Sequence, residues 1–228
     1  MVKIISDSTC DLSPDLLQKY DIDILRFTFC LEKRNTGTAG ISLRMRSLRG
    51  PMRIRQLRRL LRPSLMDAVE MLKPYVSEQR EVICFSISSG MSTSGNVMRL
   101  AAEELEASDL VTVIDSANLS TGIGLLVIEA AIMAQEGKTA GEITAVIEEL
   151  KPKVRASFVV DTLVYLYRGG RCNAVSAMAG SVLKLHPKIV VENGAMDASK
   201  KYRGKLSKVI TAYVKDLEEE LKAARPDR

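Results

Sequence analysis

The sequence predicts an α/β protein of two subdomains, with a parallel sheet in residues 1–155 and a smaller α+β unit in residues 156–228. Two observations predict it. In the first part, short runs of β-branched residues alternate with helical patterns, as they do in the βαβ units of parallel sheets. In the second part, this alternation gives way to short helical stretches and single strands. The length of 228 residues and the apolar content of 46% allow a well-buried core.

Apolar runs predict the strands of the first subdomain, because strands buried on both faces read as continuous apolar stretches. These runs are Val2–Ile5, Val82–Ile87 and Val111–Ile114, and another follows at Ser157–Val160. Helical spacing between them predicts helices at Ser64–Val76, Ser94–Leu105 and Gly124–Gln135. Thr139 and Glu142 have the spacing of a capping box, so a further helix should begin there.

After the run Ser157–Val160, with which it begins, the second subdomain mixes helices with one further strand. We expect helical stretches, a strand, a turn and a long amphipathic helix, in that order: Leu163–Arg168, Val175–Leu185, Lys188–Val191, Glu192–Gly194 and about Lys205–Ala224. A sheet with so few strands needs additional strands to be complete. We therefore expect this subdomain to be incomplete at its carboxyl end.

One segment carries all of the excess positive charge. Residues 26–62 contain eleven Lys or Arg and one acidic residue, Glu32, a charge of +10. The rest of the chain then has 22 of the 33 basic and 27 of the 28 acidic residues, a charge of −5. Three interpretations stay open: a basic arm that binds nucleic acid or anionic lipid, a solvated insertion, or a stretch translated in a shifted reading frame. We favour the shifted frame, because it would leave both flanks intact.

The sequence argues against several classes of protein. No apolar run approaches the roughly 18 to 20 residues of a membrane-spanning helix, and the amino-terminus lacks a signal-peptide pattern. We therefore expect a cytoplasmic protein. The cysteines form no C-x-x-C pair and His186 is the single histidine, so we expect reduced cysteines, no metal site and no cofactor. The cysteines are Cys10, Cys30, Cys84 and Cys172.

No pattern supplies an activated nucleophile with its base, so we do not expect an enzyme. Asp7 and Asp11 are four residues apart, whereas an aspartyl-phosphate phosphatase needs the D-x-D spacing. No G-K-[ST] follows Ser88-Ser89-Gly90 to complete a phosphate loop, and there is no G-x-S-x-G elbow. An enzyme that acts on phosphate esters stays an alternative hypothesis.

Three predicted strands end in similar polar loops: Ser6–Asp11, Ser86–Gly95 and Asp115–Asn118. Short hydroxyl residues and glycines ahead of a helix leave backbone N–H groups free, and the helix dipole adds partial positive charge. Because parallel strands end at one edge of a sheet, the loops predict a shared site for a carboxylate or phosphate. For Asp7, Asp11 and Asp115, helix capping is the alternative.

Two arginine motifs lie in the second subdomain, Tyr167–Arg171 and Lys200–Gly204. Glycine beside arginine allows the backbone to approach closely, and a guanidinium can hold a carboxylate or phosphate with two hydrogen bonds. Surface solubility is the alternative for each motif.

Five segments together resemble the DegV family of fatty-acid-binding proteins. In the family's order they are SDSTCDLS, FSISSGMSTSGN, VIDSANLSTGIGLLV, LVYLYRGGR and SVLKLHPKIVVENGAMDASKKYRGK. The resemblance covers residues 1–25 and 64–224. It implies a carrier that holds one acyl chain between two α/β subdomains, with the carboxylate at the surface. The ligand would be a long-chain fatty acid such as palmitate or oleate. The partner would be a fatty-acid kinase that makes acyl-phosphate for phospholipid synthesis.

The resemblance also implies roles for particular residues. The carboxylate would be bound by Ser88, Ser89, Gly90 and Ser92, with Asp7 and Ser8 at the same end of the sheet and Arg203 near the head group. Arg171 and Gly170 would support a turn, and the acyl tail would meet apolar residues such as Ile87, Met91 and Leu119.

Two departures from the family pattern fall on the ligand site. The family's T-S-Q-P-S motif is here Leu60-Leu61-Arg62-Pro63-Ser64, which puts leucine where the family has a threonine that helps to hold the carboxylate. The family continues about 50 residues further to an H-x-G-P-G motif, so His186 is not that histidine. A defective family member that no longer binds ligand is therefore a further alternative.

Overall fold

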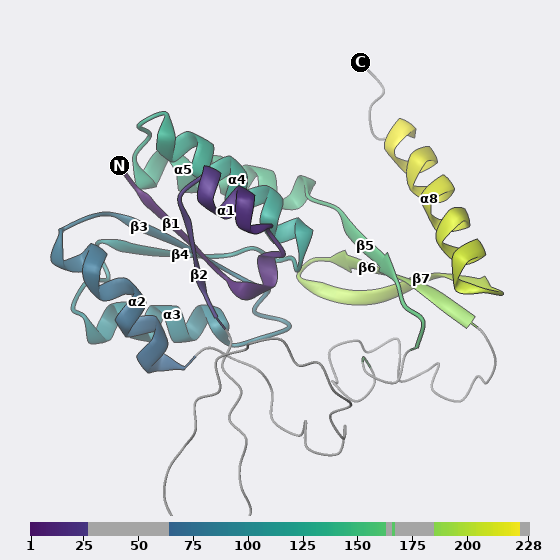
Figure 1. Cartoon of the computed structure of the whole chain (residues 1–228), viewed down its shortest axis with the longest axis horizontal. Coiled ribbons are helices and arrows are strands. Elements are labelled where there is room, and N and C mark those ends of the chain that lie inside the picture. Colours follow the sequence, from purple (N-terminus) through teal and green to yellow (C-terminus); the bar gives the residue numbers. More distant parts are fainter. Residues whose placement is uncertain (27–63, 163–165, 167–184, 224–228) are drawn as a thin grey trace, which may run out of the picture. The chain divides into compact units, whose positions relative to one another are not determined.

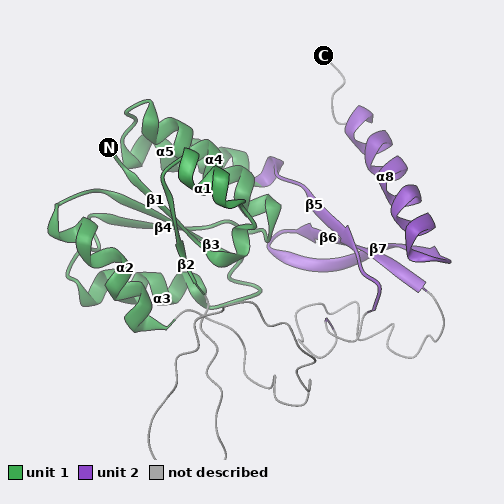
Figure 2. Cartoon of the chain, in the orientation of Figure 1, with its two compact units in different colours: residues 1–151 green, residues 152–228 purple. Residues whose placement is uncertain are grey.

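The computed structural model describes residues 1–26, 64–162, 166 and 185–223 of the chain. The chain divides into two compact units, Met1–Lys151 and Pro152–Arg228 (Figure 2). The basic segment of residues 26–62 lies outside the described residues except for Arg26, and so do Cys30 and Cys172. The α/β fold class that the sequence predicts is confirmed, because a parallel sheet with helices is followed by a smaller antiparallel sheet.

Unit 1 is built around a sheet of four parallel strands in the order β2-β1-β3-β4. The strands are β1 Lys3–Asp7, β2 Ile22–Leu25, β3 Val82–Ser86 and β4 Val111–Asp115. Every residue of the two central strands, β1 and β3, is buried. That burial explains why both strands read as unbroken apolar runs in the sequence.

Helices cover both faces of this sheet. They are α1 Pro14–Lys19, α2 Leu65–Ser77, α3 Ser94–Glu104, α4 Thr121–Gln135 and α5 Ala140–Leu150, with a 3₁₀ turn η1 at Ser8–Cys10 and another at Lys151–Lys153. In Figure 1, α2 and α3 lie on one side and α1, α4 and α5 on the other. The predicted capping box at the start of α5 is confirmed: the Thr139 hydroxyl accepts from the Glu142 N–H, and the Glu142 carboxylate accepts from the Thr139 N–H.

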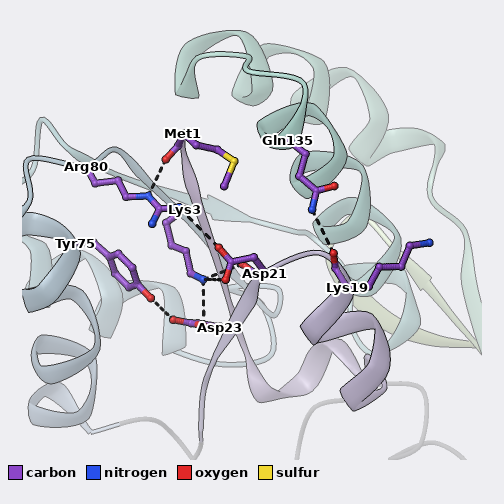
Figure 3. Close-up of polar contacts among 8 residues, drawn as sticks. All are labelled: Met1, Lys3, Lys19, Asp21, Asp23, Tyr75, Arg80 and Gln135. Carbon is purple, nitrogen blue, oxygen red and sulfur yellow. Dashed lines mark hydrogen bonds and ion pairs between the residues drawn. The ribbon is translucent and has the colours of Figure 1, made fainter.

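A polar cluster ties β1, β2 and α2 together at the amino ends of the strands (Figure 3). The Lys3 ammonium is buried and donates to the Asp21 carboxylate at 2.7 Å, and it lies 3.3 Å from a carboxylate oxygen of Asp23. The Tyr75 hydroxyl on α2 donates to Asp23. Burial, together with this bond, raises the pKa of Tyr75. Arg80 donates to the Met1 carbonyl at 2.7 Å. The sequence does not predict β2, because Asp21, just before the strand, and Asp23, within it, interrupt the apolar pattern.

Unit 2 contains a three-stranded antiparallel sheet in the order β5-β6-β7, and one long helix follows it. The elements are β5 Ala156–Val159, β6 Leu185–Glu192, β7 Ala195–Arg203 and α8 Leu206–Ala223. The predicted turn joins β6 to β7 through Asn193 and Gly194, whose φ angles are 50° and 76°. On α8, Val209 is buried and the Tyr213 hydroxyl donates to the Ser157 carbonyl at 2.7 Å.

Unit 2 differs from the sequence prediction in two places. Residues 195–203 form a strand, although their charged residues hide its alternation, and this strand includes most of the second arginine motif. Leu185 begins β6 instead of ending a helix, because it pairs with Arg203. The two short predicted helical stretches fall almost entirely outside the described residues. No helix in the described part of the chain is both long and apolar enough to cross a membrane.

Candidate ligand-binding site

The candidate site lies at the carboxyl edge of the unit 1 sheet. β2 pairs with one side of β1, and β3 pairs with the other side. From the end of β1 the chain runs to β2 on one side, and from the end of β3 it runs to β4 on the other side. Ligands of open α/β sheets bind at such a switch point, where neighbouring strands continue in opposite directions. The loops that meet there follow β1, β3 and β4, and the sequence predicts all three as polar.

The loop after β3, residues 87–93, is held together by its own serines. The Ser88 carbonyl accepts from the Met91 and Ser92 N–H groups at 2.9 and 3.0 Å. The Ser88 hydroxyl accepts from the Gly90 N–H at 3.2 Å, and the Ser92 hydroxyl accepts from the Ser94 N–H at 3.3 Å. Ser88 is buried and Ser92 is half-buried, whereas Ser89 and Gly90 are exposed.

These bonds correct one expectation from the sequence, which assumed free backbone N–H groups in this loop. The N–H groups of Ser88, Ser89, Gly90, Met91 and Ser92 all donate within the chain. Sequence alone could not show this, because the acceptors include Asn118 and Asp115, which lie far along the chain. The serine hydroxyls are therefore the groups of this loop best suited to bind a carboxylate.

Asp7 ends β1 and is completely buried. One carboxylate oxygen accepts from the Thr9 N–H at 3.1 Å and from the Thr9 hydroxyl, so Asp7 caps η1 as the capping alternative predicts. The other oxygen accepts from the Ile87 N–H at 2.8 Å and from the Ser94 hydroxyl at 2.9 Å. Asp7 therefore faces the loop after β3. Ser8, the next residue, lies in η1 and is partly exposed.

Asp115 ends β4 and contacts the same loop from the other side. Its carboxylate accepts from the Ser89 N–H at 3.2 Å and from the Ala117 N–H at 2.9 Å. Partial burial by itself would raise the pKa of Asp115, but hydrogen bonds from the Ser89 hydroxyl and from these two amides outweigh it and lower that pKa. Asp115 is therefore a charged acceptor beside the exposed part of the loop.

The loop after β4 completes this edge of the sheet. The Asn118 carbonyl accepts from the Ser88 N–H at 2.9 Å, and the Ser120 hydroxyl donates to Asp11 at 2.6 Å. Three apolar residues that we expect near an acyl tail lie in these loops: Ile87 and Leu119 are half-buried and Met91 is buried. Hydroxyl groups and apolar side chains thus belong to the same loops.

Unit 2 contains the other predicted site residue that the structure describes. Arg203 is exposed at the end of β7. Arg171 and Gly170 lie outside the described residues. Next to Arg203, a hollow of about 450 Å³ is lined by Asp161, His186, Gly204, Lys205 and Leu206. The sequence does not predict this hollow, because its lining comes from separate segments.

His186 forms part of the wall of this hollow and is buried. Its Nδ1 lies 3.1 Å from the Val160 carbonyl oxygen, and its Nε2 lies 3.1 Å from the Gly204 carbonyl oxygen. Both ring nitrogens thus contact the backbone, so the contacts of His186 are those of a structural residue.

Comparison with known proteins identifies similar chains. The model of the family described as "Uncharacterised protein, DegV family" matches residues 1–226. A DegV domain-containing protein of Clostridium perfringens is 32% identical over 226 residues, which are 95% of this chain and 77% of that protein. Two structures from Thermotoga maritima are each 28% identical and cover 96% of this chain and 76% of their own. One is described as a DegV lipid-binding protein, with a TM-score of 0.73, and the other as revealing a fatty-acid-binding function, with a TM-score of 0.72.

Proposed function

Because this chain belongs to the DegV family, we propose that it binds a long-chain fatty acid such as palmitate or oleate and acts as a carrier, not as an enzyme. The fatty-acid-binding function described for a Thermotoga maritima protein of the same fold supports the ligand class. The observation that carries the proposal is the serine-rich loop after β3, where hydroxyl groups lie beside the apolar residues Ile87 and Met91. Such a site suits a ligand with one polar end and one apolar end.

The serines of this loop bind the carboxylate in our proposal. Ser89 is exposed and Ser92 is half-buried, so both are within reach of a ligand at the edge of the sheet. The Ser89 hydroxyl bonds to Asp115, so it binds the ligand by exchanging that bond for one to the fatty-acid carboxylate. A serine hydroxyl has one hydrogen to donate and two lone pairs that accept. The Ser92 hydroxyl accepts from Ser94, and it can still donate to a carboxylate oxygen.

Binding is tested with protein stripped of lipid. The wild-type protein should take up labelled palmitate or oleate, and native mass spectrometry of freshly purified protein should show a bound fatty acid. Ser89→Ala and Ser92→Ala should each weaken binding several-fold, since a hydrogen bond contributes about 0.5 to 1.5 kcal/mol. Ser77→Ala is the matched control, because Ser77 ends α2 and bonds to the Lys73 carbonyl. A wild-type protein that takes up neither fatty acid would contradict the proposal and favour a defective family member.

We further propose that the carrier presents its fatty acid to a kinase that forms acyl-phosphate for phospholipid synthesis, and that Arg203 acts in this step. Arg203→Ala should lower the rate of acyl-phosphate formation about tenfold, about 1.4 kcal/mol in activation free energy, with palmitate affinity little changed. Lys201→Ala is the control, because Lys201 is another exposed cation of β7. Equal rates for both variants would remove Arg203 from the step.

A further inference from the structure

We propose that Asp7 and Asp115 are positioning residues, which hold the head-group loop from two sides without touching the ligand. The head-group loop is the segment Ile87–Ser94. The inference rests on the proposed function, because it assigns roles within that same site. The resemblance places Asp7 at the same end of the sheet as the carboxylate, and our inference gives it a supporting role there.

The topology of the sheet places the two aspartates on either side of the loop. β3, which leads into the loop, pairs with β1 on one side and with β4 on the other. Asp7 is the last residue of β1, and Asp115 is the last residue of β4. Asp7 follows the last β1 residue that pairs with β3, and Asp115 pairs with Ser86, the last residue of β3. Both side chains reach the loop that follows β3.

Asp7 holds both ends of the loop. The same carboxylate oxygen accepts from the Ile87 N–H, where the loop begins, and from the Ser94 hydroxyl, where α3 begins. Its other oxygen is occupied by Thr9. Because Asp7 is completely buried and both oxygens accept two donors each, its carboxylate is shielded from a ligand.

Asp115 holds the exposed middle of the loop. It accepts at 3.2 Å from the backbone N–H of Ser89, the exposed residue whose hydroxyl we propose to bind the head group. A charged acceptor makes stronger hydrogen bonds than a neutral one. Asp115 therefore determines where Ser89 and the following Gly90 lie, and a carboxylate bound by this loop depends on that placement.

The proposal predicts a defect confined to the polar end of the ligand. Asp115→Asn keeps the shape of the side chain. One carboxylate oxygen is replaced by an NH₂ group, which cannot accept a hydrogen bond from the N–H of Ser89 or Ala117. Asp109→Asn is the matched control, because Asp109 precedes β4 and is exposed. Ser94→Ala tests the Asp7 side by removing one donor, which avoids changing a buried carboxylate whose loss can prevent folding.

The test uses palmitate labelled with ¹³C either at the carboxyl carbon or at the terminal methyl carbon. In Asp115→Asn and Ser94→Ala, the carboxyl resonance of bound palmitate should move and the methyl resonance should stay in place. The Kd should rise about tenfold in Asp115→Asn, which is about 1.4 kcal/mol, and Asp109→Asn should match the wild-type protein. A purely structural role would move both resonances or lower the thermal midpoint without moving the carboxyl resonance.

The outcomes separate this inference from the proposed function. The wild-type protein could bind palmitate while both variants show the wild-type Kd and the wild-type resonances. That result would overturn the positioning role and leave fatty-acid binding standing. A wild-type protein that binds no palmitate would overturn the proposed function. Amide hydrogen exchange still tests the positioning role in that case. The amide protons of Ser89 and Gly90 should exchange faster in Asp115→Asn than in the wild-type protein. Unchanged exchange rates would contradict the positioning role.

Discussion

At the scale of single residues, the site depends on close packing around a few small side chains. Gly122, in the first turn of α4, shows how little room there is. A Cβ atom at this position would lie 2.1 Å from the Asn118 carboxamide oxygen, and Asn118 is itself buried and bonded to the Leu119 N–H at 3.0 Å. Glycine is therefore required here by the approach of a neighbouring side chain and not by an unusual φ angle.

Gly122→Ala should destabilise unit 1 by about 1 to 3 kcal/mol, because overpacking forces the Asn118 carboxamide oxygen away from the Leu119 N–H. Gly141→Ala is the matched control in α5, where an added Cβ meets nothing within 4 Å. Because alanine favours helix over glycine, the control should be neutral or stabilising by about 0.5 kcal/mol. Thermal unfolding of the two variants measures this difference. Equal midpoints would contradict the packing argument.

At the scale of elements, α8 is attached to the unit 2 sheet by polar contacts more than by apolar ones. Lys188 on β6 is buried, forms an ion pair with Glu220, and lies 5.9 Å from the centre of the Tyr213 ring. Asp216 pairs with Lys200 at 2.6 Å and accepts from the Tyr202 hydroxyl. Hydrogen bonds from Lys200 and Tyr202 lower the pKa of Asp216. The outer residues Ile210, Val214 and Leu221 are exposed.

Glu220→Ala should cost unit 2 about 1 to 2 kcal/mol. The substitution leaves the buried Lys188 ammonium without its carboxylate partner, and the cost is below that of a fully buried pair because Glu220 is itself exposed. Glu218→Ala is the control on the same helix, since Glu218 and Lys222 are both exposed and such pairs contribute little. Urea unfolding followed by the fluorescence of the unit 2 tyrosines measures both variants. An equal loss of unfolding free energy in Glu220→Ala and Glu218→Ala would show that solvent screens the ion pair of Lys188 with Glu220.

At the scale of the whole molecule, charge is distributed very unevenly along the chain, with +10 on residues 26–62 and −5 on the rest. The residues on either side of this segment contact one another directly. Asp23 on β2 accepts from Tyr75 on α2, and both lie beside the Lys3 ammonium (Figure 3). These contacts hold β2 to α2 without the basic residues.

Replacement of residues 27–63 by a short Gly-Ser linker should therefore leave unit 1 folded, with a thermal midpoint near that of the wild-type protein. Such a linker is a flexible coil that adapts to the distance between its ends. The same variant tests the nucleic-acid alternative, because a genuine basic arm would give the wild-type protein affinity for DNA that falls steeply with salt. We expect no difference in DNA binding between the two proteins. Loss of a salt-dependent affinity on replacement would establish the arm instead.

The α/β class, the central strands and the start of α5 can be predicted from the sequence, because they depend on local apolar runs and on a capping box. The sequence also placed the polar loops together at one edge of the sheet, since parallel strands share that edge. The edge strands β2 and β7, in contrast, are recognised only in the folded structure. β2 depends on the contacts of Asp21 and Asp23 with Lys3, and β7 depends on pairing with β6.

The roles that we propose within the site likewise rest on tertiary contacts. Asp7 and Ser89 are both polar residues of strand-end loops in the sequence, and nothing local separates them. In the fold, Asp7 is buried against Ile87 and Ser94, whereas Ser89 is exposed and bonded to Asp115. Burial and long-range hydrogen bonds depend on residues that are distant in the chain. A sequence pattern therefore locates such a site, and packing assigns which of its residues face the ligand.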